Sequence, residues 1–254
     1  MSYTLYHGDY RKKLKLEKES IDACLSSPPY NIGSKAKKKL RNRKAGEYDA
    51  KSYSAITDYA DNLPEEEYQQ QQIEFIEWCA EALTENGVLI YNHKDRHKDG
   101  RLISPLEWIH KQSALTLRAS ITWDRLGTHN FCKNFPYHIK EEIYILSKNK
   151  KYYFKNADFP GGTRKGVPDV WRIPKVSKKE TTHNAAFPLK LAEHCVRLWC
   201  PPSGTLCDAY SGSGTAAVAC YNTGRNFVGA ENLKKYVKMA VGRAMKEGFI
   251  LNVK

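Results

Sequence analysis

Several patterns are missing from this 254-residue sequence, and each absence removes a class of protein. No apolar run approaches the length of a membrane span, and the N-terminus lacks a signal peptide's apolar core, so we expect a cytoplasmic protein with no membrane partner. The seven cysteines form no Cys-x-x-Cys pair, and the histidines lack metal-ligand spacing, so no metal site is expected. An odd number of cysteines, several in apolar segments, predicts buried free thiols and argues against a disulfide framework.

Acidic residues are also scarce relative to basic ones. The chain has 28 Asp and Glu against 41 Lys and Arg, which gives a formal net charge of +13. Such a charge predicts a polyanionic partner, although it says nothing about the fold. The hydrophobic fraction of 41% supports a real core, and the length suits one sizeable α/β domain with insertions or two small ones.

Strand-like and helix-like segments alternate along most of the chain. Strands are expected at 3–6, 21–25, 88–91, 120–123, 142–146, 205–209 and 227–230, and helices at 64–86, 102–113, 187–199, 215–221 and 234–246. This succession predicts an α/β fold with a mostly parallel twisted sheet and helices on both faces. Residues 34–63 are polar and without apolar period, so we expect a mobile basic loop there.

The most informative run is Ser27-Pro28-Pro29-Tyr30, which follows an apolar strand. Two consecutive prolines cannot continue a helix or donate to a central sheet ladder, so the run predicts a stiff turn. Such a turn presents a hydroxyl, a rigid carbonyl and an aromatic face to one point, which suits a flat heteroaromatic amine. The alternative is a Pro-Pro loop with a packing tyrosine.

A second motif runs from Asp208 to Thr215, where a strand, a glycine-rich turn and a helix follow one another. Glycines let the backbone approach a ligand, and a helix N-terminus turns free N–H groups toward it. Glu231, at the end of the next strand, has the position of a carboxylate that binds ribose hydroxyls. A tight turn and a helix-capping acid are the alternatives. The full dinucleotide fingerprint and the P-loop lysine are absent, which disfavours NAD and ATP.

Together these two motifs resemble the amino-methyltransferases of DNA, which use S-adenosyl-L-methionine (SAM). The catalytic motif precedes the cofactor motif, as in the family's β-type circular permutation. Further matching segments are His7-Gly8-Asp9, 87–92, 142–148, 169–174 and 183–188. The resemblance implies a Rossmann-like class I methyltransferase fold that is circularly permuted. Its parts are a catalytic half at 1–146, a basic target-recognition insertion at 147–182 and a cofactor-binding half at 183–254.

The resemblance also implies the residues of each site. The catalytic set is Ser27, Pro28, Pro29 and Tyr30. The SAM-binding set is His7, Asp9, Tyr10, Ser26, His183, Phe187, Pro188, Asp208, Tyr210, Ser211, Gly212, Ser213, Gly214, Thr215, Glu231 and Asn232.

A chemical mechanism follows from the catalytic turn. A side-chain oxygen and the Pro28 carbonyl accept the hydrogens of a nucleobase amine, Tyr30 stacks on the base, and the target base must be flipped out of the duplex. Adenine enzymes of the family usually have aspartate at the position of Ser27, so we favour N4 of cytosine and keep N6 of adenine open. Ser26 is an alternative hydroxyl. Without a Pro-Cys nucleophile, C5 methylation is disfavoured.

Two basic regions suit double-stranded DNA as the substrate. The first is Lys35, Lys37, Lys38, Lys39, Arg41, Arg43 and Lys44; the second contains Lys151, Tyr152, Arg164, Lys165 and Arg172. A solvated charge run and a small aromatic core are the alternatives for the two regions. Trp123, Trp171 and Trp199 are expected to be packing residues.

We therefore expect a site-specific DNA methyltransferase of a restriction-modification system, monomeric or homodimeric, with a cognate restriction endonuclease as a potential partner. Two other readings stay open. The first is an RNA or protein amino-methyltransferase, and the second is a catalytically silent DNA-binding module. Transfer of a labelled methyl group to DNA, RNA or protein distinguishes the three.

Overall fold

The computed structural model describes residues 1–32, 61–127, 136, 138–159, 166–176 and 187–254. Its main feature is a nine-stranded sheet in the order β11-β1-β10-β9-β2-β3-β7-β6-β8. The strands are β1 (Tyr3–His7), β2 (Ile21–Ser26), β3 (Leu83–His93), β6 (Thr116–Asp124), β7 (Lys140–Ser147), β8 (Val170–Arg172), β9 (Thr205–Asp208), β10 (Asn226–Glu231) and β11 (Asn252–Val253).

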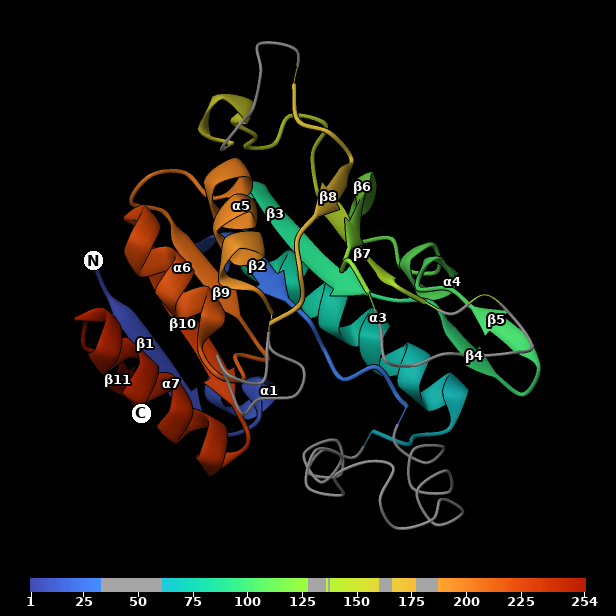
Figure 1. Cartoon of the computed structure of the whole chain (residues 1–254), viewed down its shortest axis with the longest axis horizontal. Coiled ribbons are helices and arrows are strands. Elements are labelled where there is room, and N and C mark those ends of the chain that lie inside the picture. Colours follow the sequence, from blue (N-terminus) through green and yellow to red (C-terminus); the bar gives the residue numbers. More distant parts are fainter. Residues whose placement is uncertain (33–60, 128–135, 137, 160–165, 177–186) are drawn as a thin grey trace.

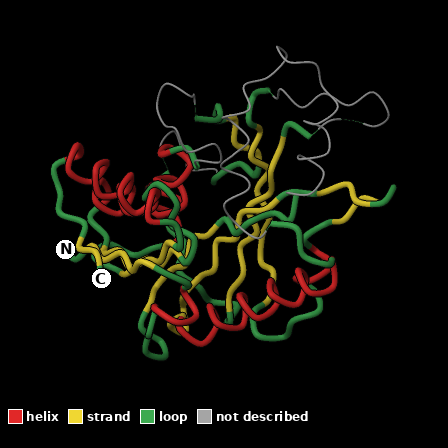
Figure 2. The backbone as a smooth tube through the Cα atoms, turned by 90° about the horizontal axis from the view of Figure 1, so that it is seen from below, coloured by secondary structure: helices red, strands yellow, loops and turns green. Residues whose placement is uncertain are grey.

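Helices cover both faces of this sheet, as expected (Figures 1 and 2). They are α1 (Tyr10–Lys13), α3 (Glu65–Ala82), α4 (Leu106–Ile109), α5 (Leu189–Trp199), α6 (Thr215–Thr223) and α7 (Lys234–Glu247), with a 3-10 turn η3 (Asn156–Asp158). One core cluster joins the sheet to α5, α6 and α7, and a second joins it to α1, α3 and α4. Two apolar cores on opposite faces are what a parallel sheet buried on both sides requires.

The sheet topology decides where a site can form. β1, β10, β9, β2 and β3 run parallel, so their carboxyl ends meet at one edge. β7 runs antiparallel to β3 and pairs Glu142 with His93, which brings the start of β7 to the same edge. Ligands of open α/β sheets bind outside such carboxyl ends.

Two expected helices have different limits in the structure. The helix predicted at 64–86 ends at Ala82, because Leu83 already pairs with Ile21 of β2 as part of β3. The helix predicted at 102–113 forms only at Leu106–Ile109. Its first residues belong to β5 (Arg101–Ile103), which pairs with β4 (Arg96–Lys98) in a hairpin beside the main sheet (Figure 1). Asp99 and Gly100 both have positive φ, the geometry of a two-residue hairpin turn.

The region 147–182 contributes to the main sheet through β8, which pairs with β6. Trp171 on β8 is buried and stacks near Trp199, and Trp123 is buried in the same core cluster. The prediction that these tryptophans are packing residues is confirmed.

The cysteine prediction is confirmed for the six described cysteines, all of which are buried and free. Cys132 lies outside the described residues. Within the described residues we find no helix long and apolar enough to cross a membrane, and no cluster of three or more side chains suited to a metal ion.

Candidate active site

The glycine-rich turn links β9 to α6 through backbone contacts. Gly214, at the N-cap of α6, has a φ of 77°, and a Cβ atom there would lie 2.8 Å from the Cβ of Ala240 on α7. The turn therefore needs glycine both for its left-handed backbone and for its close approach to α7. The Ser211 amide donates to the Ala230 carbonyl at 2.9 Å, which fastens the turn to β10.

Glu231 connects the glycine turn to the start of α7. Its Oε2 accepts the Gly212 amide and its Oε1 accepts the Leu233 amide, each at 2.8 Å. These contacts are those of an acid at a helix start, the alternative considered for this residue. The ribose-binding role of Glu231 stays a prediction.

A buried pair joins the glycine turn to the strand of the catalytic motif. The Ser26 hydroxyl donates to Asp208 Oδ1 at 3.0 Å and accepts the Ala209 amide at 3.2 Å. The Tyr210 amide also donates to Asp208 Oδ1, at 3.0 Å. Burial raises the pKa of Asp208 to about 7, partly offset by the Tyr210 amide. Ser26 is therefore engaged with Asp208 and is not placed as the hydroxyl of the catalytic turn.

The first strand brings more of the predicted cofactor residues to this edge. His7 pairs with Glu231 across the sheet, and the Gly8 amide donates to the Glu231 carbonyl at 2.9 Å. Asp9 caps α1 and forms an ion pair with Arg11 at 2.6 Å.

The remaining predicted cofactor residues differ in exposure. Tyr10 is buried and packs edge-on against Tyr210, while Asn232 is exposed. Ser213 and Thr215 are buried, and Thr215 accepts a hydrogen bond from Arg243. Pro188 begins α5, Phe187 contacts Trp123, and His183 lies outside the described residues.

The turn Ser27–Tyr30, predicted to be catalytic, is held by a side-chain network that sequence reasoning missed. The Ser27 and Tyr30 hydroxyls lie 2.8 Å apart, and Tyr30 donates to Glu141 Oε2 at 3.0 Å. Asn92 Nδ2 lies 2.7 Å from the Tyr30 hydroxyl and 2.9 Å from Glu141 Oε2. Arg125 completes the network with an ion pair to Glu141 at 2.9 Å. Asn92 and Glu141 come from the adjacent ends of β3 and β7.

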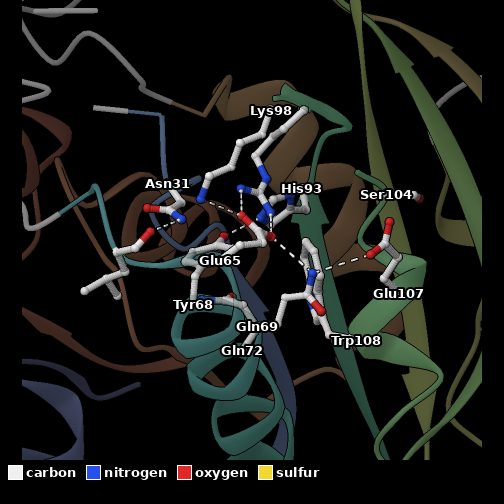
Figure 3. Close-up of polar contacts among 12 residues, drawn as sticks. Asn31, Glu65, Tyr68, Gln69, Gln72, His93, Lys98, Ser104, Glu107 and Trp108 are labelled. Atoms are coloured by element: carbon white, nitrogen blue, oxygen red, sulfur yellow. Dashed lines mark hydrogen bonds and ion pairs between the residues drawn. The ribbon is translucent and has the colours of Figure 1, made fainter. Parts of the chain in front are cut away.

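A second set of contacts fixes the proline carbonyls. Tyr68 on α3 donates to the Pro29 carbonyl at 2.8 Å and lies 2.6 Å from His93 Nε2 (Figure 3). Because Tyr68 gives its single proton to the Pro29 carbonyl, His93 Nε2 carries the ring proton and donates to Tyr68, while His93 Nδ1 accepts the Lys94 amide. Burial lowers the pKa of His93 to about 3, so the ring stays neutral. Within the described residues, we find no hydrogen bond to the Pro28 carbonyl.

Contacts around Glu65 continue from Tyr68 and His93 along the same side of the site (Figure 3). Arg96 and Lys98 of the hairpin bind Glu65 at the start of α3, at 2.7 and 3.3 Å. The hairpin is thereby anchored to the helix that carries Tyr68.

Asp61 fastens the chain directly after the catalytic turn. Its carboxylate accepts the Asn31 and Ile32 amides, and Asn31 Nδ2 donates to the Leu63 carbonyl at 3.0 Å. Asn31 has a positive φ of 56°. Residues 31–32 and 61–63 therefore lie together beside Tyr30. The first predicted DNA-binding set lies outside the described residues: Lys35, Lys37, Lys38, Lys39, Arg41, Arg43 and Lys44.

The second predicted DNA-binding set is only partly described. Lys151 is exposed, and the Arg172 side chain is 74% exposed near Asp124. Tyr152 is partly buried against the core, which agrees with the packing alternative. Arg164 and Lys165 lie outside the described residues.

Comparison with known proteins decides the family. Residues 21–242 match the N6/N4 methyltransferase family, described as DNA methylase. This chain belongs to that family. It is therefore a DNA methyltransferase of the N4/N6 type, and the family is one of SAM-dependent enzymes, as predicted.

Three relatives illustrate the similarity. The type II methyltransferase M.ScaI of Streptomyces caespitosus is 25% identical, over 96% of this chain and 81% of the relative. The DNA adenine methyltransferase YhdJ of Escherichia coli K12 is 22% identical, over 94% and 82%. The structure of the cytosine-N4-specific PvuII DNA methyltransferase superposes with a TM-score of 0.74 at 18% identity, over 96% and 86%. The predicted Rossmann-like fold is confirmed.

Proposed function

We propose that this chain transfers a methyl group from SAM to the exocyclic N4 of a flipped-out cytosine at a specific site in double-stranded DNA. The observation that carries the proposal is the arrangement of Ser27 next to the Pro28 carbonyl, which has no hydrogen bond among the described residues, at the edge that also holds Asp208. A hydroxyl oxygen and a carbonyl oxygen give two acceptors for the two hydrogens of an amine. Positioning and electrostatics then supply the acceleration.

The described residues fit SAM as the methyl donor. When bound, SAM supplies an electrophilic methyl group on a positively charged sulfonium. Three acids, Asp9, Asp208 and Glu231, end or follow neighbouring strands at the edge of the sheet, which favours a cationic ligand there. The left-handed glycine turn between Asp208 and α6 leaves the backbone open to close approach.

Serine at position 27 and the likeness to a cytosine-N4-specific enzyme both support cytosine. Adenine N6 is the second candidate, because YhdJ, a DNA adenine methyltransferase, is similar over 94% of this chain. Similarity to a type II methyltransferase supports a restriction-modification system with a cognate endonuclease. The order of the motifs supports the β-type permutation, with 147–182 as the target-recognition insertion between the two halves.

The test is expression of the full chain in a host free of DNA methylation, followed by nucleoside mass spectrometry and single-molecule sequencing of its DNA. We expect N4-methylcytosine at one recognition sequence. N6-methyladenine instead would overturn the cytosine assignment, and transfer of label only to RNA or protein would overturn the DNA substrate. Tight DNA binding without transfer would favour a silent module.

A further inference from the structure

The hydrogen-bond network around Tyr30 has only one consistent direction. A carboxylate accepts hydrogen bonds and cannot donate them, so Tyr30 uses its single proton toward Glu141. The Tyr30 oxygen must then accept from Ser27 at 2.8 Å. The proton of Ser27 therefore lies along the line to Tyr30. One lone pair of Ser27 accepts Asn92 Nδ2 at 3.3 Å, which leaves the other for a ligand.

Glu141 is fixed in the orientation that this direction requires. Arg125 donates to its Oε1 at 2.9 Å and Asn92 to its Oε2 at 2.9 Å, and the residue is only 8% exposed. Arg125 is itself held by the His138 and Ile139 carbonyls. Burial and the neighbouring Glu141 raise the pKa of Tyr30 well above its usual value, so the phenol keeps its proton.

We propose that Glu141 is a positioning residue that makes Ser27 a pure hydrogen-bond acceptor toward the target amine. This inference rests on the proposed function of Ser27. A serine hydroxyl can either donate or accept, and a proton turned toward the amine would oppose the amine hydrogens. A carboxylate at position 27 would need no such help. Glu141 acts through Tyr30 to give serine the acceptor character that aspartate has by itself.

The network around Tyr30 also contains a second buried hydrogen-bond acceptor, the side-chain oxygen of Asn92. Asn92 is 1% exposed, and its Oδ1 has no hydrogen-bond partner among the described residues. A buried acceptor of this kind is costly unless a ligand satisfies it. It suits a base that brings amine hydrogens to the network.

The test compares Glu141→Gln with Glu142→Gln. Glu142 is the next residue on β7, is equally buried and contacts Ser120 and Thr122 on the opposite face. In E141Q the amide oxygen stays with Arg125, and the amide nitrogen replaces the oxygen that accepts both Tyr30 and Asn92. Tyr30 then has no acceptor there, and its proton turns toward Ser27. We expect kcat to fall about 10- to 100-fold in E141Q with KM for DNA and SAM affinity unchanged. E142Q should stay within about threefold of the wild type.

A mutant cycle separates positioning from simple structural support. In an S27D background, E141Q should change kcat by less than about threefold, because a carboxylate at position 27 has no proton to orient. If S27D is inactive, Y30F is used as the background instead. Y30F removes the hydroxyl that links Glu141 to Ser27, so adding E141Q should lower kcat no further. An equal loss from E141Q in every background would overturn the proposal.

The failure of this inference can be distinguished from failure of the proposed function. If wild-type protein adds no methyl group to DNA, the proposed function is wrong. If the wild type methylates DNA and E141Q matches E142Q, only the role of Glu141 is wrong. If the wild type methylates adenine and the mutant cycle gives the expected result, the target base is adenine and the role of Glu141 is still supported. Both bases present an exocyclic amine to Ser27.

Discussion

The two halves of the site are built in different ways. Around β9 and β10, backbone amides of the glycine turn and of α7 make the contacts, with Glu231 receiving two of them. Around β2, β3 and β7, side chains bind one another, as Tyr30, Asn92 and Glu141 do. A backbone turn is specified by neighbouring residues, whereas a side-chain network depends on strands far apart in sequence. The first kind of site can be found from sequence, and the second needs the fold.

The largest expected effect tests whether these halves are separable. Tyr30→Ala removes the hydroxyl shared by Ser27, Asn92 and Glu141, together with the ring that lies 4.5 Å from His93. We expect methyl transfer to fall by at least about 1,000-fold, because both the acceptor geometry and the aromatic contact are lost. SAM affinity should change by less than about threefold. Labelled methyl transfer and calorimetry measure the two quantities.

A loss of SAM affinity as large as the loss of methyl transfer in this variant would contradict the view that the two halves of the site are separable. It would mean that the catalytic turn supports the cofactor site directly, through the Ser26–Asp208 contact next to it. An unchanged melting temperature serves as the control for folding.

Sequence reasoning predicted the turn at Ser27–Tyr30 as catalytic but did not predict the residues that orient it. Ser27–Tyr30 is recognisable because two prolines and a tyrosine follow a strand. In the sequence, Asn92 was recognised only as part of the segment 87–92, which contains a buried strand. Glu141 lies just before the strand expected at 142–146. Their role depends on β7 running antiparallel to β3, a pairing that no local pattern in either strand encodes.

The fold shows the same division between local and distant signals. The parallel core followed from alternating strands and helices, and its helix starts fell close to the prolines and glycines expected to mark them. The hairpin turn Asp99-Gly100 is a turn signal that sequence reasoning missed, and the helix expected at 102–113 was therefore started too early, within β5. β8 has only three residues, and it forms because Trp171 is buried beside β6.

The second-largest expected effect is that of Gly214→Ala, in the half of the site around β9 and β10 that is built from backbone contacts. A side chain there must adopt a φ of 77° and meet Ala240 at 2.8 Å, so we expect a loss of about 1–3 kcal/mol in the free energy of unfolding. SAM affinity should fall at least about tenfold, because the turn must move. Chemical denaturation and calorimetry provide the measurements.

Gly242→Ala is the matched control. Gly242 lies on the same helix as Ala240, and a Cβ atom there meets nothing within 4 Å. This variant should be neutral or up to about 1 kcal/mol more stable than the wild type, with unchanged SAM affinity. Similar losses of stability and SAM affinity in both variants would show that the conformation of the glycine turn is not their cause.

The smallest expected effect is a pH dependence from Asp208, which lies where the two halves meet. Burial raises its pKa to about 7 from 3.8, so the folded chain retains a proton there that the unfolded chain releases. The contribution of this group to stability therefore falls as pH rises from about 4 to about 7. Affinity for the cationic SAM should change in the opposite direction, by about tenfold between pH 6 and pH 8, because the ionised carboxylate attracts the ligand. Asp208→Asn should remove both trends, as measured by calorimetry and denaturation across this range. An Asn variant that keeps the pH dependence of SAM affinity would place the titrating group elsewhere, and Asp208 would then serve only to hold Ser26 and the Tyr210 amide.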